Sequence, residues 1–225
     1  INTTKNYLHK NMIFKQLKVI RKLSLTNSTV LITFEVPDKL EEFFHYLSGQ
    51  YVTVKIKGEN GVENSRCYSL CGDIKEKHIS IAVKKVPNGI VSNYLCDDLL
   101  IGDILDVSKA DGNFTIEKTN GFEKENCVFI SAGSGITPIK SMIENLVSKH
   151  YKGNIYLIYG NNNESEIIFK TFLETIQREN KNIKIIQTLK ETSLVWDGEQ
   201  GRLISANINK LFENYNLPIE NTNFY

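Results

Sequence analysis

One segment combines glycines with residues that suit the start of a helix. Residues 132–138 read Ala-Gly-Ser-Gly-Ile-Thr-Pro and directly follow an apolar run that predicts a buried strand. Glycine lets the backbone turn tightly and approach a ligand closely, and Thr137 and Pro138 suit the N-cap and the first helical position. The N–H groups and dipole of such a helix start favour a phosphate. The segment predicts a phosphate-binding loop, with a purely structural turn as the alternative.

A second segment places a permanent positive charge beside an aromatic ring. Arg66, Tyr68 and Ser69 lie in a stretch that is expected to form a strand. In a strand, Arg66 and Tyr68 share one face, where the guanidinium could hold a phosphate and the phenol could stack on a planar ring. Taken alone, the pair is better explained as an ordinary surface arginine beside a half-buried tyrosine.

Composition excludes several classes of protein. The 225 residues carry 27 Lys and Arg against 26 Asp and Glu, so the basic surface typical of nucleic-acid binders is missing. No apolar run is long enough for a membrane helix, and the first residues lack the apolar core of a signal peptide. Four cysteines are typical of free thiols in a reducing compartment. We therefore expect a cytoplasmic protein with no nucleic-acid or membrane partner.

The cysteines also do not predict a metal site. Cys67 and Cys71 are four residues apart, but the Cys-X4-Cys-X2-Cys pattern of a plant-type [2Fe–2S] domain is absent. We expect no metal in this chain.

The first half of the chain predicts an antiparallel β-barrel or sandwich. Short apolar or alternating runs separated by turn residues indicate strands, which we expect at residues 14–19, 30–36, 51–57, 67–70, 79–85 and 104–107. Short helical pieces are expected at residues 37–47 and 92–100, the second with Ser92 as its N-cap.

The second half alternates strands with helices. Buried strands are expected at residues 127–131, 155–159 and 183–189, and helical patterns at residues 136–147, 167–176 and 203–212. Such alternation is typical of a doubly wound parallel sheet. With a polar linker at residues 118–126, the chain is expected to form a β domain at 12–118 and an α/β domain at 126–225.

The order of these motifs resembles the ferredoxin–NADP reductase superfamily, in which an FAD-binding β-barrel precedes a nicotinamide-nucleotide-binding α/β domain. Besides the two segments above, the resemblance rests on residues 49–54, 81–84, 89–95, 102–103, 112–114, 159–161 and 167–169. Within the superfamily the chain is most similar to the reductase components of bacterial oxygenases, of the phenylacetyl-CoA epoxidase reductase type.

The resemblance implies a role for each matching residue. Arg66 would pair with the flavin pyrophosphate, Tyr68 would stack on the isoalloxazine, and Ser69 would bond near its reactive nitrogen. The other residues implied to contact the flavin are Ala82, Val83, Lys84, Val91 and Ser92. Those implied to bind the nicotinamide nucleotide are Gly133, Ser134, Gly135, Thr137, Tyr159, Gly160 and Asn161. Tyr68, Ser69 and Thr137 would be the catalytic residues, with Thr137 close to the flavin where the hydride passes.

The implied activity is the transfer of a hydride from NADH or NADPH to FAD, then of single electrons to a protein acceptor such as a ferredoxin, a flavodoxin or an oxygenase. Glu164 and Glu166 lie where NADPH-binding proteins usually carry cations for the 2′-phosphate. This favours NADH unless Lys190 and Arg202 fold into the site.

Other interpretations stay open. One is a flavin-binding electron-transfer subunit without independent turnover. Another is a flavin reductase that releases reduced flavin, or a ferredoxin or flavodoxin reductase with no oxygenase partner. The chain stops at Tyr225, where the family continues into a Cys-Gly-Pro segment and further nucleotide contacts. We therefore expect a C-terminally incomplete sequence, beyond which a [2Fe–2S] domain could follow.

Overall fold

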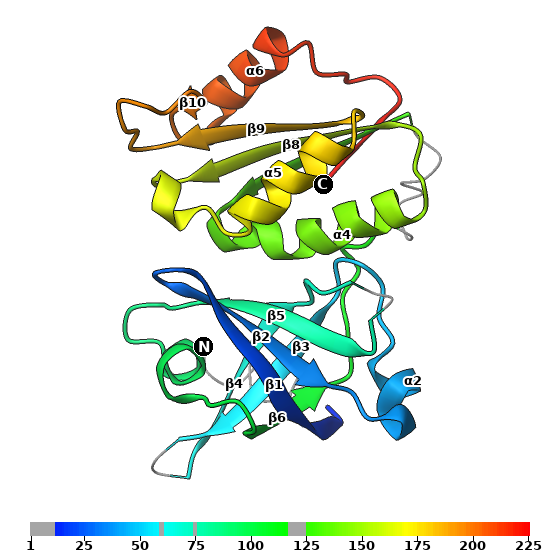
Figure 1. Cartoon of the computed structure of the whole chain (residues 1–225), viewed down its shortest axis with the longest axis vertical. Coiled ribbons are helices and arrows are strands. Elements are labelled where there is room, and N and C mark those ends of the chain that lie inside the picture. The colour runs from blue at the N-terminus through cyan, green and yellow to red at the C-terminus, as the bar shows by residue number, and fades with distance from the viewer. Residues whose placement is uncertain (1–11, 59–60, 74–75, 117–124) are drawn as a thin grey trace, which may run out of the picture.

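The computed structural model describes residues 12–58, 61–73, 76–116 and 125–225. An antiparallel barrel forms one end of the molecule, and a parallel sheet flanked by helices forms the other (Figure 1). Most of the expected linker lies outside the described residues, and the domain bounds stay a prediction. Within the described part of the chain, no helix combines the length and apolar character that crossing a membrane requires.

The barrel is a six-stranded sheet in the order β4-β3-β6-β1-β2-β5. Its strands are β1 (Phe14–Thr26), β2 (Thr29–Glu35), β3 (Tyr51–Lys57), β4 (Glu63–Ser69), β5 (His78–Lys84) and β6 (Ile104–Ser108). The two end strands meet where Leu70 pairs with Ile81 and the Cys71 N–H donates to the Ser80 carbonyl over 2.9 Å. This closure places the end of β4 against β5.

Apolar residues of the strands fill the barrel. Val52 and Val54 of β3 are fully buried, as are Ile32 and Phe34 of β2. The helical pieces are η1 (Asp38–Leu40), α2 (Glu41–Phe44), α3 (Ile90–Asn93) and the π-turn η2 (Tyr94–Asp98). The expected helix at 92–100 therefore begins two residues earlier, at Ile90.

The parallel sheet has the strand order β10-β9-β8-β7-β11. Its strands are β7 (Asn126–Ala132), β8 (Asn154–Asn161), β9 (Ile183–Leu189), β10 (Glu199–Gln200) and β11 (Thr222–Phe224). The helical elements are η4 (Gly133–Gly135), α4 (Ile136–Ser148), η5 (Glu164–Glu166), α5 (Lys170–Glu179) and α6 (Ser205–Asn214). The apolar residues of α4 and α5 pack in one core and those of α6 in another, on the opposite face of the sheet. The doubly wound arrangement is confirmed.

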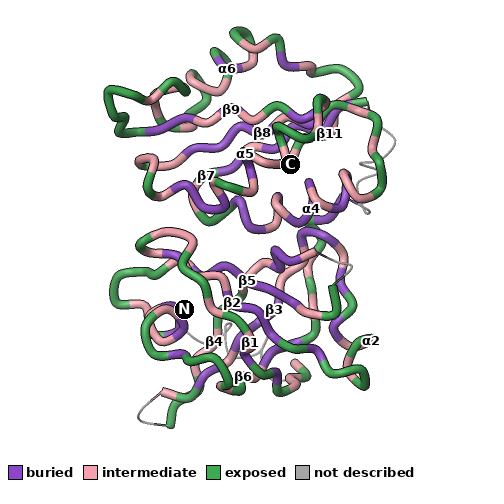
Figure 2. Tube along the Cα trace, viewed as in Figure 1, coloured by how far each residue is buried: buried purple, intermediate pink, exposed green. Residues whose placement is uncertain are grey.

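The two halves share an apolar core. Cys71 and Ala82 of the barrel belong to the same buried cluster as Ile136 and Met142 of α4, and Figure 2 shows buried backbone on both sides of this junction. Gly49, with φ of +99°, lies in the junction, because a Cβ there would stand 2.3 Å from the Met142 side chain. The junction is therefore packed like a protein interior.

Candidate nucleotide and flavin site

The predicted flavin motif lies where the barrel closes. Asn64, Arg66 and Tyr68 share one face of β4, because side chains alternate along a strand. The closure brings β4 into contact with β5, and α3 packs against β4. Strand β5 in turn contacts η4, the glycine turn of the α/β half. The two motifs that sequence analysis singled out therefore meet at one junction.

Arg66 is exposed and available to an anion. Its guanidinium donates to the carbonyl of the adjacent Ser65 over 2.7 Å. It has no carboxylate partner among the residues that the structure describes. Because arginine stays charged and its planar fork matches phosphate oxygens, this geometry suits a pyrophosphate.

Tyr68 and Ser69 occupy the half-buried end of β4. The Tyr68 ring packs partly against the barrel core. Burial raises the pKa of its phenol, with Cys96 adding to the effect and Arg66 opposing it. Tyr68 therefore stays neutral and presents an aromatic surface with a hydroxyl donor, which suits a planar ring system.

The β5 residues divide between two environments. Ala82 is buried in the core that the two halves share, and Val83 is buried in the barrel core. Their side chains are turned into protein, so contacts to a flavin would come from their backbone. The next residue, Lys84, reaches across to the α/β half, where its ammonium lies 2.8 Å from the Glu166 carboxylate.

Helix α3 differs from the expectation in its start. Gly89, not Ser92, is the N-cap, and Ser92 is buried with its hydroxyl accepting the Val86 N–H over 3.2 Å. Its hydroxyl is therefore engaged with the turn before the helix and does not cap the helix. Val91 is buried in the barrel core, so its side chain is structural.

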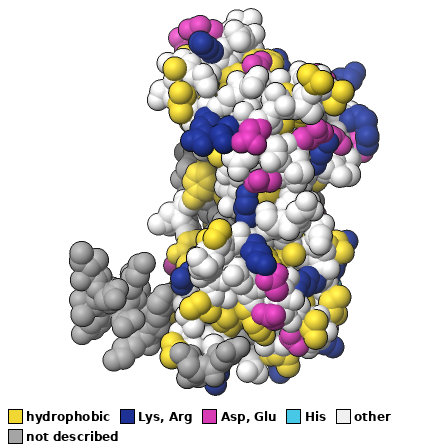
Figure 3. Space-filling model, turned by 90° about the vertical axis from the view of Figure 1, so that its left-hand side faces the viewer, with side chains coloured by type: hydrophobic (Ala, Val, Ile, Leu, Met, Phe, Trp, Pro, Cys, Tyr) yellow, Lys and Arg dark blue, Asp and Glu magenta, His cyan; other side chains and the backbone are white. Residues whose placement is uncertain are grey.

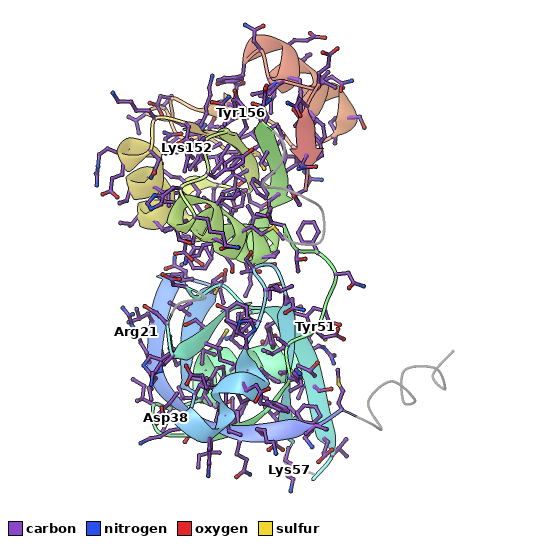
Figure 4. All side chains as sticks on the ribbon, turned by 90° about the vertical axis from the view of Figure 1, so that its right-hand side faces the viewer. Arg21, Asp38, Tyr51, Lys57, Lys152 and Tyr156 are labelled. Carbon is purple, nitrogen blue, oxygen red and sulfur yellow. The ribbon has the colours of Figure 1, made fainter. Side chains whose placement is uncertain are left out.

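A cavity of about 970 Å³ continues the face of β4 that carries Arg66 and Tyr68. Its lining includes Lys57, Asn64, Gly89, Ile90 and Tyr94. Lys57 lies at the end of the barrel remote from the α/β half (Figure 4). The volume is in the range of cofactor sites, so the cavity offers room beside the motif for the nucleotide portion of a dinucleotide.

The glycine loop has the open backbone that a phosphate site requires. Gly133 has φ of +51°, and a Cβ placed there would meet nothing within 4 Å. Ser134 and Gly135 are exposed. Beneath them, the buried Ser131 hydroxyl has no hydrogen-bond partner among the described residues and lies 3.0 Å from the ideal Cβ position of Gly135. The open space above Gly133 leaves room for a ligand, and the Ser131 hydroxyl crowds the place that a Cβ at Gly135 would take.

The start of α4 also differs from the expectation. Gly135 is the N-cap, and Thr137 and Pro138 are the second and third residues of the helix. The Thr137 hydroxyl donates to the Ser134 carbonyl over 3.0 Å, so it closes the η4 turn instead of capping α4. Pro138 still lies in the first turn, where its missing N–H breaks no intrahelical bond.

Tyr159 supports the loop from below. It is fully buried, and its hydroxyl donates to the Gly133 carbonyl over 3.0 Å. Its side chain therefore holds the loop and does not itself reach the cleft. Gly160 and Asn161, the next residues of β8, do line a cleft of about 390 Å³ at the carboxyl ends of the parallel strands, the usual place for ligands in such sheets.

The cleft is more cationic than expected. Lys84, Lys190 and Arg202 line it together with Glu166. Sequence analysis named Lys190 and Arg202 only as residues that could fold into the site. It missed Leu203, Ile204 and the pairing of Lys84 with Glu166. Only the long-range fold reveals these neighbours.

Comparisons with known proteins match the two halves separately. Residues 16–116 match the oxidoreductase FAD-binding domain, and residues 129–225 match the oxidoreductase NAD-binding domain. Within the described part of the chain, no group of His, Cys, Asp and Glu could hold a metal ion.

The chain is also similar to individual proteins. A component of the 1,2-phenylacetyl-CoA epoxidase from Escherichia coli (strain K12) is 29% identical over 199 residues, covering 88% of this chain and 55% of that protein. The ferredoxin reductase component of 3-ketosteroid-9-alpha-monooxygenase from Rhodococcus rhodochrous is 32% identical over 152 residues, or 67% of this chain and 42% of that protein. This chain thus spans about half the length of these relatives.

A solved structure supports the same arrangement. The CS-b5R domains of human Ncb5or, in the NAD+ form, match with a TM-score of 0.79 and 25% identity over 95% of this chain and 61% of that chain. Both domain matches fall in the expected order on a barrel and a doubly wound sheet, and on this ground the chain belongs to the ferredoxin–NADP reductase superfamily of FAD- and NAD-binding oxidoreductases.

Proposed function

We propose that this chain is the reductase part of an electron-transfer system. It would accept a hydride from NADH or NADPH onto FAD and pass single electrons to a protein acceptor of the iron–sulfur or flavodoxin type. The observation that carries the proposal is the contact of β5 with η4, which brings the flavin motif and the glycine loop to one packed junction. Hydride transfer needs the two reacting rings in contact.

Different residues of the chain would bind different parts of FAD. When bound, FAD supplies the redox chemistry, and the protein supplies position and electrostatics. Arg66 would hold the pyrophosphate, because its guanidinium faces no acid among the described residues. Tyr68 would stack on the ring system, and Ser69 would offer its hydroxyl to the ring edge.

Thr137 would act at the other side of the junction. Its hydroxyl closes the η4 turn and its side chain is buried at the start of α4. It would fix the position of the Gly133–Gly135 turn. The N–H groups of this turn would bind the nicotinamide nucleotide. Gly160 and Asn161 would contact the adenosine side from the cleft.

The acceptor is proposed from the names of relatives. One relative is the ferredoxin reductase component of a monooxygenase and another is a component of an epoxidase. An oxygenase system is therefore the acceptor that we propose. The four free cysteines favour a reducing compartment, so we propose the cytoplasm.

The charge pattern of the surface agrees with a small-molecule and protein partner. On the face in Figure 3, lysine and arginine are interspersed with aspartate and glutamate. The net charge is +1. A nucleic-acid partner would instead favour a continuous basic surface.

An anaerobic absorbance titration tests the proposal. The purified protein is loaded with FAD, and NADH and NADPH are added in separate experiments. Flavin bands that bleach with either nucleotide support the reductase, and transfer to an artificial acceptor measures turnover. Flavin that binds but resists both nucleotides would favour an electron-transfer subunit instead. Failure to bind FAD after reconstitution would contradict the role of Arg66 and Tyr68.

A further inference from the structure

Lys140 joins the two halves of the molecule through a backbone carbonyl. It lies on α4, and its ammonium donates to the Cys71 carbonyl over 2.9 Å. Cys71 follows the flavin motif directly and takes part in the closure of the barrel through its N–H bond to Ser80. Lys140 itself lies one helical turn after Thr137. One side chain therefore connects the end of the flavin strand to the start of the nucleotide-binding helix.

The ammonium is enclosed by further groups. Glu144, one turn along α4, accepts from it over 2.6 Å. The rings of Phe172 and Phe169 lie 4.6 and 5.5 Å from the nitrogen. The Lys140 side chain is only 12% exposed. Such a cation, with an acid, a carbonyl and aromatic faces around it, is held in one position.

Phe169, one of the two rings beside the ammonium, has an unusual backbone conformation. Its φ of +63° is in the left-handed region, which a bulky residue rarely adopts, and it forms the N-cap of α5. It belongs to the shared core, where it is buried. Lys140 thus contacts the barrel, α4 and α5 together, and all three meet beside the junction of β5 with η4.

We propose that Lys140 is a positioning residue that fixes the distance between the flavin strand and the nucleotide loop. The proposal rests on the proposed function, because it assigns Lys140 to the hydride-transfer geometry of that site. Lys140 touches neither cofactor in this assignment. It acts through the Cys71 carbonyl and through α4. Since hydride transfer is steep in distance, a small displacement of the loop would slow the reaction by about tenfold or more.

The variant Lys140→Met tests this by removing the charge while keeping the length of the side chain. Glu144 would then be left half-buried without its cation, which could destabilise the fold. The double variant Lys140→Met/Glu144→Gln removes that stranded charge. Lys140→Arg keeps a cation that can donate to the carbonyl and lie over the rings. Lys184→Met is the matched control, because Lys184 lies over the Tyr215 ring at 4.5 Å but is remote from the junction.

Two readouts are measured on each variant. The first is amide hydrogen exchange at residues 70–73 and 136–145, measured without nucleotide. The second is the rate of flavin reduction at saturating nucleotide, together with nucleotide affinity. We expect Lys140→Met and the double variant to exchange faster in both segments and to reduce flavin about tenfold more slowly, with affinity within about twofold of wild type. Lys140→Arg recovers most of the rate, and Lys184→Met behaves like wild type.

Other outcomes would overturn the proposal. A reduction rate of Lys140→Met close to wild type, or a slow rate with unchanged exchange in both segments, contradicts positioning. A double variant that regains the wild-type rate shows that the stranded Glu144 charge caused the defect. If wild type itself is not reduced by nucleotide, the proposed function fails, and the exchange data still decide whether Lys140 ties the two halves together.

Discussion

Lys84 of β5 and Glu166 of η5 form an ion pair across the junction, with 2.8 Å between the ammonium and the carboxylate oxygen. The two residues are 82 positions apart in the chain. Asn162 also donates to the same carboxylate oxygen over 3.3 Å. The pair stands at the edge of the cationic cleft, so it links the strand expected to line the flavin with the loop expected to hold adenosine.

The pair predicts a loss of stability in acid. The hydrogen bond from Lys84 lowers the pKa of Glu166 below its ordinary value of 4.5, against the opposing effect of burial. A depressed carboxyl pKa contributes stability that is fully present above 4.5 and is lost as the pH falls through the folded-state pKa. We expect the difference in melting temperature between wild type and Lys84→Met to shrink below this pH. Lys57→Met, an exposed lysine on the far end of the barrel, should show no such change; equal pH dependence in both variants would contradict the pairing.

Substitution of Gly133 should lower nucleotide affinity by more than its effect on folding stability explains. In Gly133→Ala the left-handed φ of +51° costs about 1 kcal/mol of folding free energy, while the new methyl meets no protein atom within 4 Å. The methyl would instead enter the space where we propose that the nucleotide binds. Gly102→Ala is the matched control, because it also has a positive φ and open space but lies in a barrel turn. We expect both variants to lose stability and nucleotide affinity to fall only in Gly133→Ala, measured by thermal unfolding and by titration. Unchanged affinity in Gly133→Ala would exclude the loop from the site.

We predict that the protein needs the Arg66 side chain to retain FAD. Arg66→Ala would remove the charge-assisted bonds that we propose to the pyrophosphate, and we expect FAD binding to weaken about ten- to a hundredfold. Arg21→Ala is the control, since Arg21 lies on the flank of the barrel (Figure 4). The ratio of flavin to protein after gel filtration measures the effect. Stoichiometric FAD in Arg66→Ala would show that the motif does not hold the flavin.

The regular elements could be predicted because their patterns are local. The bounds of β3 and β9 agree with the expected ranges, since alternation in one and a continuous apolar run in the other mark each strand. The helix starts could not be predicted as well. Thr137 and Ser92 have the side chains of N-caps, but each makes a different bond, to Ser134 and from Val86. The short edge strands β10 and β11 form only because β9 and β7 offer them partners.

The site could be predicted in part for the same reason. The glycine loop and the flavin motif are short segments whose residue types already carry the chemistry. The tie between Lys140 and Cys71 joins residues 69 positions apart, and no local pattern contains it. The same holds for the cations that line the cleft, which come from β5, from the end of β9 and from the residues after β10.

The charges of the cleft predict a preference for NADPH. Sequence analysis favoured NADH because Glu164 and Glu166 follow the second strand, but both are paired in the structure, with Lys170 at 2.6 Å and Lys84 at 2.8 Å. Arg202 lines the cleft, and its guanidinium has no acidic partner among the described residues. An unpaired cation beside the proposed adenosine end is what a 2′-phosphate requires. We therefore expect NADPH to be the donor.

The variant Arg202→Ala tests this preference. We expect it to raise the KM for NADPH about tenfold, the effect of losing one charge-assisted bond, and to leave the KM for NADH within about twofold. Arg178→Ala is the control, because Arg178 lies on α5 beside Glu179 and outside the cleft. Steady-state kinetics with both nucleotides measure the change. Equal increases for the two donors would place Arg202 against the pyrophosphate that they share, and the preference for NADPH would then have no basis in this cleft.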